Sequence, residues 1–267
     1  MDITITDWFG YNLPPKERMR LIKAAGFSGI IGLMWSDLFD ANYKQFPAYA
    51  RNAGLYVENM HAMWNGVNEL WTDNLVGQGF MEEVLKNIKV CSDYEIPAVV
   101  LHPECKNGIE YAELPDNFNI GIERLKKIID TAEQLNINIA IENMARPEYL
   151  DCIFKNIQSK RLGFCFDSGH WNLFMPEVDL LTLYGDRLLA LHLHDNDGVN
   201  DWHALPFSGN IDWDDIRVKL KTVDYKGSIA LEVGNKTFEH ITEAEEFLRI
   251  AAEKAKKLIE GKKSNEY

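Results

Sequence analysis

Six side chains of the kinds that bind metals stand at the ends of strongly apolar runs in this sequence. Each run has the length of a buried strand, and each leads directly into a His, Glu or Asp. The six residues are His61, His102, Glu142, Asp167, His192 and Glu232. This pattern predicts parallel strands that direct ligands to one point, as at the carboxyl ends of the strands of a parallel β/α barrel.

The alternation of segments along the chain supports the same architecture. Short β-rich runs are separated by longer segments of helical period, as expected for βα units around a parallel sheet. We expect eight helices and eight strands, the strands near residues 2–6, 29–33, 55–60, 97–102, 137–142, 162–167, 188–194 and 228–232. The predicted fold class is α/β, a single (β/α)8 TIM barrel over residues 1–260, followed by a polar tail over 261–267.

Proline and glycine mark the limits of the first expected helix. Pro14-Pro15 suits its first turn, and Gly26 suits its carboxyl-terminal cap. A helix of clear apolar period is expected over 119–135, and another closes the chain over 242–259. The helices near 73–94 and 178–184 are the least well defined by the pattern.

Composition narrows the class of protein. The net charge of −13 argues against a nucleic-acid partner, although a local basic groove would be compatible with it. The cysteines Cys91, Cys105, Cys152 and Cys165 form no CxxC pair, which favours reduced thiols and a cytoplasmic location. We expect no signal peptide at Met1–Ile5 and no membrane partner, because no apolar run approaches the roughly 18 residues that span a bilayer.

Four of the strand-end residues, Glu142, Asp167, His192 and Glu232, combine carboxylate with imidazole. This mixture suits a divalent Mn²⁺, Mg²⁺, Co²⁺ or Zn²⁺ ion, and the lack of a nearby cysteine disfavours a structural zinc site. A single residue of this kind is more often the cap of the next helix. That interpretation explains Asp167 well and Glu142 poorly, because a Glu directly after an apolar strand would be buried without a partner.

Further candidates follow the last strands. Gly169 would let the backbone turn sharply, so that His170 and Asp167 face the same cavity. His192 and His194 share the inner face of their strand, because residues two apart lie on one side. Asp201 and His203 lie in a loop, where a solvated turn and a ligand pair are equally good interpretations.

These residues resemble the xylose isomerase-like TIM-barrel superfamily, which contains sugar and sugar-phosphate isomerases and epimerases, inosose dehydratase and endonuclease IV. The resemblance extends from His61 to Glu232, and its most specific segments are Ile141-Glu142-Asn143, Asp167-Ser168-Gly169-His170, His192-Leu193-His194-Asp195 and Asp201-Trp202-His203. By position, Glu142, Asp167, His192 and Glu232 are similar to the metal ligands of the epimerases. The resemblance also implies further metal ligands of the kind that endonuclease IV uses for three zinc ions, at His61, His102, His170, Asp201 and His203.

The chain also departs from the family pattern. Phe207 stands where the family's Pro-Gly-x-Gly turn has its first glycine, and His194 stands where relatives commonly have Asn or Ser. The segments with which endonuclease IV grips abasic DNA are not recognisable in 103–110 or 144–150, and no Lys/Arg cluster with interleaved aromatics replaces them.

The leading hypothesis is a metal-dependent isomerase or epimerase of a small sugar, sugar phosphate or polyol derivative. Glu142 and Glu232 would transfer protons on opposite faces of the substrate, and His170 would be a third catalytic residue. His194 would bind the substrate. Trp8, Trp35, Trp64 and Trp171 could pack against the sugar's C–H faces, although packing beneath the loops is at least as good an interpretation for each.

Two other functions stay open. An endonuclease IV-type phosphoester hydrolase with several zinc ions is favoured by the nine matched ligand positions and opposed by the charge and the missing DNA-gripping segments. A non-catalytic sugar-binding protein would have no need for two opposed bases. The sequence leaves the oligomeric state open, including a homo-oligomer.

Overall fold

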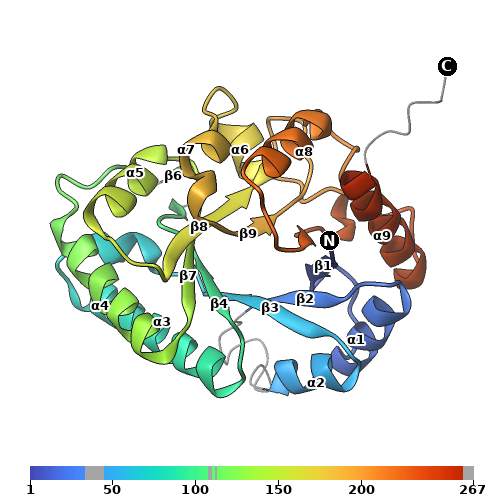
Figure 1. Ribbon diagram of the computed structural model, residues 1–267, viewed down its shortest axis with the longest axis horizontal. Coiled ribbons are helices and arrows are strands. Elements are labelled where there is room, and N and C mark those ends of the chain that lie inside the picture. The colour runs from blue at the N-terminus through green and yellow to red at the C-terminus, as the bar shows by residue number, and fades with distance from the viewer. Residues whose placement is uncertain (34–44, 108–109, 112, 261–267) are drawn as a thin grey trace.

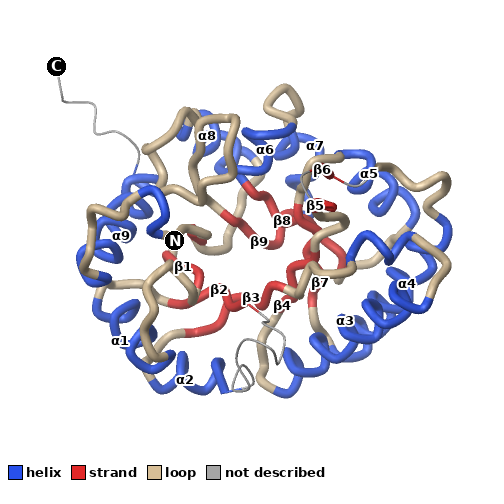
Figure 2. Tube along the Cα trace, turned by 180° about the vertical axis from the view of Figure 1, so that it is seen from behind, coloured by secondary structure: helices blue, strands red, loops and turns tan. Residues whose placement is uncertain are grey.

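The computed structural model is a ring of parallel strands enclosed by helices (Figures 1 and 2). The structure describes residues 1–33, 45–107, 110–111 and 113–260. Eight strands form one sheet in the order β10-β1-β2-β3-β4-β7-β8-β9. They are β1 (Ile3–Thr6), β2 (Gly29–Leu33), β3 (Tyr56–His61), β4 (Ala98–Leu101), β7 (Asn138–Glu142), β8 (Leu162–Asp167), β9 (Leu188–His192) and β10 (Ile229–Leu231).

The first and last strands in this order approach each other and close the ring. Leu193, just past β9, forms a parallel bridge with Leu231 of β10, and its N–H donates to the Ala230 carbonyl at 2.9 Å. The Glu232 N–H donates back to the Leu193 carbonyl at 3.1 Å. The protein is therefore the predicted single (β/α)8 TIM barrel, with the carboxyl ends of all eight strands at one mouth.

Within the described residues the structure has nine α-helices, one more than the pattern predicted. They are α1 (Pro15–Ala24), α2 (Phe46–Asn52), α3 (Leu75–Asp93), α4 (Asn119–Leu135), α5 (Pro147–Asn156), α6 (Ser168–Phe174), α7 (Leu180–Tyr184), α8 (Trp213–Thr222) and α9 (Ala244–Glu260). Between these stand the 3-10 turns η2 (Val67–Trp71), η3 (Gly185–Arg187) and η4 (Asn235–Thr237), and the small hairpin β5 (Lys106–Asn107) and β6 (Glu110–Tyr111). The added helix is α6, which begins directly at a candidate ligand because the Asp167 side chain caps it.

Local signals fixed the helix limits where they were strong. Pro15 begins α1, and Gly26 follows its end with φ +95°, a conformation that favours glycine. The ill-defined patterns near 73–94 and 178–184 became α3 and α7. The expected tail over 261–267 and the candidate Trp35 lie outside the described residues.

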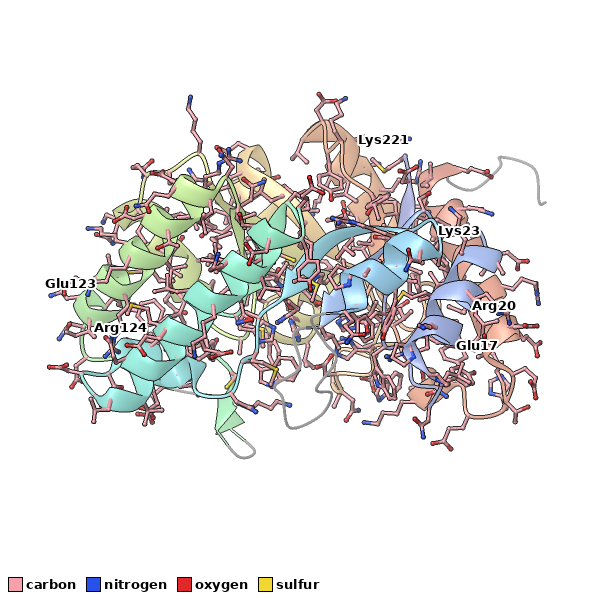
Figure 3. All side chains as sticks on the ribbon, turned by 90° about the horizontal axis from the view of Figure 1, so that it is seen from below. Glu17, Arg20, Lys23, Glu123, Arg124 and Lys221 are labelled. Carbon is pink, nitrogen blue, oxygen red and sulfur yellow. The ribbon has the colours of Figure 1, made fainter. Side chains whose placement is uncertain are left out.

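Long-range contacts join neighbouring helices on the outside of the barrel. In Figure 3 Arg124 projects from α4 toward the adjacent η2 and α3. Its Nη1 donates to the carbonyls of Glu69, Leu70 and Thr72 at 3.0, 2.8 and 2.6 Å, and its Nη2 donates to Asn74 at 3.1 Å. One buried guanidinium thus satisfies four carbonyls of the segment that leads from β3 into α3.

The inside of the barrel narrows to a layer of small residues just below the mouth. Val100, Ala140, Cys165 and Ala190 form a separate buried apolar cluster. Each of them stands two positions before a strand-end candidate, so the candidate side chains lie on the same inner face, one step nearer the mouth. No helix among the described residues has both the length and the apolarity to cross a membrane.

Candidate active site and metal centre

A cavity of about 540 Å³ opens at the carboxyl ends of the strands. Its floor carries histidines and carboxylates, and its rim carries tryptophans, asparagines and two lysines. The predicted candidates that line it are Trp8, His61, Trp64, His102, Glu142, His170, Asp201, His203 and Glu232. The strand ends therefore meet at one point, as their pattern predicted.

Glu142 is at the centre of the floor. This fully buried carboxylate faces four imidazoles: its Oε2 lies 3.2 Å from His61 Nε2 and 2.9 Å from His192 Nδ1. Its Oε1 lies 3.4 Å from His102 Nε2 and 3.1 Å from His170 Nδ1. Glu142 is thus buried, but with imidazole nitrogens on every side.

Backbone carbonyls orient two of the histidines toward this cavity. His61 Nδ1 lies 2.7 Å from the Ala62 carbonyl, and His203 Nδ1 lies 3.0 Å from the Glu232 carbonyl. A carbonyl can only accept, so both Nδ1 atoms donate and both Nε2 atoms are turned toward the cavity, where loss of the Nε2 proton would free a lone pair for a metal ion. His203 has φ +48°, a left-handed conformation that is held by its Nδ1 contact with Glu232 and by its carbonyl, which accepts the Gly234 N–H at 2.9 Å.

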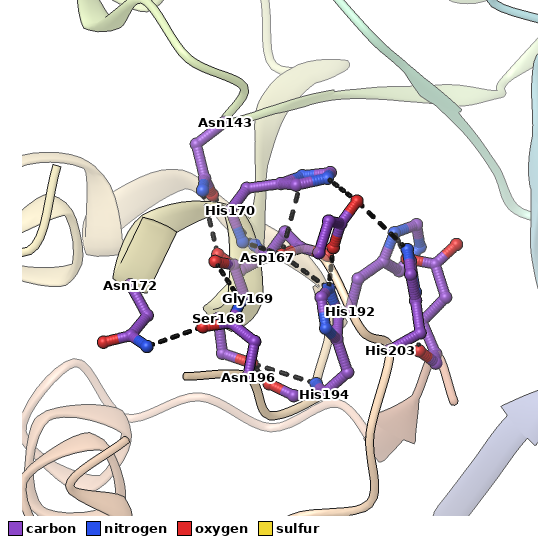
Figure 4. Close-up of polar contacts among 12 residues, drawn as sticks. Asn143, Asp167, Ser168, Gly169, His170, Asn172, His192, His194, Asn196 and His203 are labelled. Carbon is purple, nitrogen blue, oxygen red and sulfur yellow. Dashed lines mark hydrogen bonds and ion pairs between the residues drawn. The ribbon is translucent and has the colours of Figure 1, made fainter. Parts of the chain in front are cut away.

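Asp167, predicted to join Glu142, His192 and Glu232, contacts a neighbouring group of side chains. Its Oδ1 accepts the His170 backbone N–H at 2.6 Å and lies 3.1 Å from His194 Nε2 (Figure 4). Asn143 holds the strand end, because its amide accepts from the Asp167 N–H and donates to the Asp167 carbonyl, each at 2.8 Å. Asp167 therefore caps α6, as one interpretation predicted, and its carboxylate also lies among the other candidate ligands.

The loop pair Asp201 and His203 completes this second group. Asp201 Oδ2 lies 3.6 Å from His170 Nε2 and 3.5 Å from His203 Nε2. The loop is anchored by the buried Asp195, whose carboxylate accepts the Ser208 N–H at 3.0 Å and the Trp213 Nε1–H at 2.9 Å. The ligand-pair interpretation of Asp201 and His203 is the one that this geometry favours.

The charges in the site shift one another's pKa values. Burial by itself would raise the pKa of Glu142, but His192 and His102 hold it well below its usual range. Burial would lower the pKa of His192 and of His170, yet the neighbouring acidic groups raise both well above the usual value. Burial would also lower the pKa of His203, but the neighbouring Asp201 carboxylate outweighs this effect and raises the pKa to about 9.

This set of donors fits a divalent cation. His61, His192 and Glu232 each offer a ligand atom within 4.8 Å of the others, and so do Asp167, His170 and His194. Several of these buried atoms make no hydrogen bond of good geometry among the described residues: both oxygens of Glu142, both ring nitrogens of His192 and Oδ2 of Asp167. The ion-pair distances from Glu142 to its four imidazoles are 2.9–3.4 Å. Buried polar atoms that lack hydrogen bonds are costly in a protein, and a bound cation would offset that cost.

The aromatic candidates divide into two sets. Trp8 and Trp64 line the cavity, and the Trp64 ring stacks on His102 with 5.9 Å between ring centroids. Trp171 is not among the residues that line it, because its indole N–H donates to the Val178 carbonyl at 2.9 Å and its ring packs on the core. His194 also does not line the cavity: it is fully buried, and its ring stacks on that of His203 with 4.1 Å between ring centroids. Trp171 and His194 are therefore support rather than cavity lining.

The sequence pattern missed one donor near the floor. A ligand atom of Cys165 lies within 4.8 Å of ligand atoms of Glu142 and His192, so the expected lack of a nearby cysteine is wrong. Cys165 precedes Asp167 by two residues on β8, and this spacing on a strand could have indicated a shared inner face.

One loop expectation changes, and the structure gives a backbone reason for a second. Gly169 makes no sharp turn but lies within α6, where a Cβ would come 1.9 Å from the His194 ring; the glycine is needed for this close approach. Phe207 has φ +65°, the conformation that suits the glycine of the family turn. The Lys257 ammonium lies 4.5 Å from its ring centroid, and this packing holds the strained residue.

Comparison with known sequences places these features in a family. Residues 19–258 match the sequence model of the family described as xylose isomerase-like TIM barrel. The protein y4fM of Sinorhizobium fredii is 30% identical over 87% of each chain. A probable endonuclease 4 of Mycoplasma capricolum is 22% identical over 56% of this chain and 62% of its own length.

Two solved structures have the same fold. A D-tagatose 3-epimerase-like protein is 24% identical with a TM-score of 0.71, covering 95% of this chain and 99% of its own. The IolI protein, solved with a bound zinc atom, is 17% identical with a TM-score of 0.81, covering 99% of this chain and 100% of its own. At these identities the likeness concerns the fold. The strand-end ligands, the closed barrel and the match over 19–258 lead to one conclusion: this chain belongs to the xylose isomerase-like TIM barrel family.

Proposed function

We propose that this protein is a metal-dependent isomerase or epimerase of a small sugar, sugar phosphate or polyol derivative. The observation that carries the proposal is the arrangement of Glu142 and Glu232, which come from β7 and β10 and both line the cavity. Proton transfer at a carbon next to a carbonyl needs one group to remove the proton and another to return it.

The residues of the floor are suited to this chemistry. Glu142, His192 and Glu232 would hold the ion with His61, and Asp167 would contribute from the second group. A bound divalent ion would bind the carbonyl oxygen and the adjacent hydroxyl oxygen of a sugar and so acidify the proton on the carbon beside the carbonyl. The ionised Glu142 and Glu232 would accept and return that hydrogen, and His170, next to Glu142, would hold a substrate hydroxyl.

The walls of the cavity suit a sugar. Trp8 and Trp64 offer flat apolar faces for C–H groups, while Asn65 and Asn235 at the rim can bond hydroxyls. The fold shared with a D-tagatose 3-epimerase-like protein supports the same substrate class.

Solvent-isotope exchange tests this proposal directly. The protein, loaded with Mn²⁺, Co²⁺ or Zn²⁺, would be incubated in D₂O with a panel of ketoses that includes D-tagatose and D-fructose, and with phosphorylated ketoses. Proton NMR would follow the carbon-bound hydrogens beside the carbonyl. Incorporation of deuterium, with appearance of an epimer or isomer, supports the proposal. Binding of a sugar without exchange would instead support the non-catalytic sugar-binding alternative.

A phosphoester hydrolase is the second candidate. It is favoured by the second donor group, Asp167, His170, His194, Asp201 and His203, which could hold further ions beside the first. Clustered metal ions of this kind activate a hydroxide for phosphoester hydrolysis. Metal analysis separates the two functions: about one ion per chain favours the isomerase, and about three favour the hydrolase.

A further inference from the structure

Cys165 is a buried donor that the proposed reaction does not use. It lies on the inner face of β8, fully buried, and its backbone partner across the ladder is Glu142 of β7. A bulge between Phe164 and Cys165 shifts the register with β9, so that Cys165 pairs with Ala190. The regular register with β7 sets the thiol beside Glu142, and the bulge against β9 sets it two residues below His192.

The small residues around the thiol leave it next to the candidate ligands. The apolar layer below the mouth is otherwise formed by Val100, Ala140 and Ala190, none of which carries a donor atom. Its Sγ, a carboxylate oxygen of Glu142 and a ring nitrogen of His192 all lie within 4.8 Å of one another. A metal ion held by Glu142 and His192 would therefore have sulfur within reach on the barrel side.

The groups around the sulfur point to a ligand rather than to simple packing. Both oxygens of Glu142 and both ring nitrogens of His192 are fully buried, and among the described residues none of them makes a hydrogen bond of good geometry. Their polar neighbours are one another, with Glu142 Oε2 2.9 Å from His192 Nδ1. A buried cysteine alone is well explained as a small hydrophobic residue. A buried cysteine beside a carboxylate and an imidazole that converge in this way has the composition of a site for a thiophilic ion.

We propose that Cys165 is a metal-selectivity residue, whose sulfur makes this centre prefer Zn²⁺ and Co²⁺ over Mn²⁺ and Mg²⁺. Thiolate sulfur favours zinc and cobalt, whereas an all oxygen and nitrogen set accepts manganese and magnesium more readily. On binding, the S–H bond breaks, its proton passes to solvent and the sulfur lone pair forms the bond to the ion, as coordinated thiols are deprotonated outright. The proposal rests on the metal centre of the proposed function but not on the reaction.

The experiment measures metal binding by the protein itself, in the absence of any sugar. Zn²⁺, Co²⁺ and Mn²⁺ affinities are determined for the wild-type protein and for Cys165→Ala and Cys165→Ser. The matched control is Cys91→Ala, because Cys91 is an equally buried thiol on α3. The absorption spectrum of each Co²⁺-loaded protein reports directly on a sulfur–cobalt bond through its near-ultraviolet charge-transfer band.

We expect this band in the wild-type protein and in Cys91→Ala, and its loss in Cys165→Ala. The preference for Zn²⁺ over Mn²⁺ should fall at least about tenfold in both Cys165 variants, within the range by which changes at and around metal ligands alter affinity. Thermal unfolding of the metal-free variants checks that the barrel is intact; should Cys165→Ala fail to fold, Cys165→Ser and the wild-type spectrum decide the matter.

A wild-type Co²⁺ protein without the band would overturn the proposal, and so would an unchanged zinc preference in the Cys165 variants. Absence of deuterium exchange into any sugar would contradict the proposed function while leaving the band and the selectivity intact. The two failures are therefore distinguishable.

Discussion

Glu142 and Glu232 direct one carboxylate oxygen each to the same nitrogen of His192. Glu142 Oε2 lies 2.9 Å from His192 Nδ1, and Glu232 Oε2 lies 3.2 Å from it. The two glutamates come from strands that are three steps apart around the closed ring. They therefore flank one position at the barrel mouth rather than belonging to separate sites.

This relationship predicts that Glu142→Gln and Glu232→Gln each lose nearly all turnover while the fold survives. Amides cannot accept the substrate proton, and general acid–base groups contribute about 10²–10⁴-fold. The measurement is deuterium exchange with the ketose that the wild-type protein uses, beside the exposed control Glu148→Gln. Near-normal exchange in either site variant would show that the two-base mechanism is wrong.

We predict one strongly held ion and weaker binding of a second or third at high zinc. Glu142, His192 and Glu232 stand at rigid strand ends, whereas Asp201 and His203 lie on a loop whose ordering costs entropy. Zinc titration followed by calorimetry measures the classes of site. Asp201→Asn should weaken only the later ones, and a loss of the tightest site in this variant would contradict the order.

We predict no useful cleavage of abasic DNA by the zinc-loaded protein. The chain carries a net charge of −13, and the described residues that line the cavity include two lysines, Lys106 and Lys236, which is too few for a groove that binds a run of phosphates. Incubation with an end-labelled abasic duplex measures incision. Strand breaks at the rate of a repair enzyme would reverse the ranking of the two proposed functions.

The stability of the metal-free protein should fall as the pH rises from about 6.5 to about 9. The pKa of His203 is about 9 in the folded state and about 6.5 in the unfolded state. Its contribution to the free energy of unfolding is therefore present in full below about pH 6.5 and is lost as the pH rises through about 9. Urea unfolding across this range measures the slope. The His203→Gln variant should have a shallower slope than the exposed control His240→Gln, and equal slopes would disprove the assignment.

A second pH effect of the same sign is expected at Glu104, in the loop after β4. This carboxyl is fully buried, and burial raises its pKa to about 7 despite the backbone N–H groups of Arg146 and Ala145. The folded state favours the protonated carboxyl. Its contribution to stability is therefore present in full below about pH 4.3 and is lost as the pH rises through about 7. Glu104→Gln cannot ionise, so it should unfold with a free energy about 1–3 kcal/mol higher than wild type at pH 8. A loss of stability at pH 8 would mean that the ionised carboxylate is needed by the loop.

The sequence by itself determined the strands, their inner faces and the residues at the mouth. Apolar runs that end in His61, Glu142 or Glu232 specify both a buried strand and the point where it ends, because period two ties each side chain to a face. The family resemblance was carried by the same residues, and the match over 19–258 confirmed it.

Only the tertiary structure decided which of these side chains share a group. The bulge at Phe164/Cys165 shifts the register of β8 against β9, and no local sequence pattern predicts this shift. It pairs Cys165 with Ala190 and so sets the thiol near His192, while the capping of α6 directs Asp167 toward His170 and His194. The position of Trp171 outside the cavity lining likewise depends on tertiary packing, because its indole N–H donates to the Val178 carbonyl. Contacts between strands and between helices depend on stagger and crossing geometry, which a one-dimensional pattern does not contain.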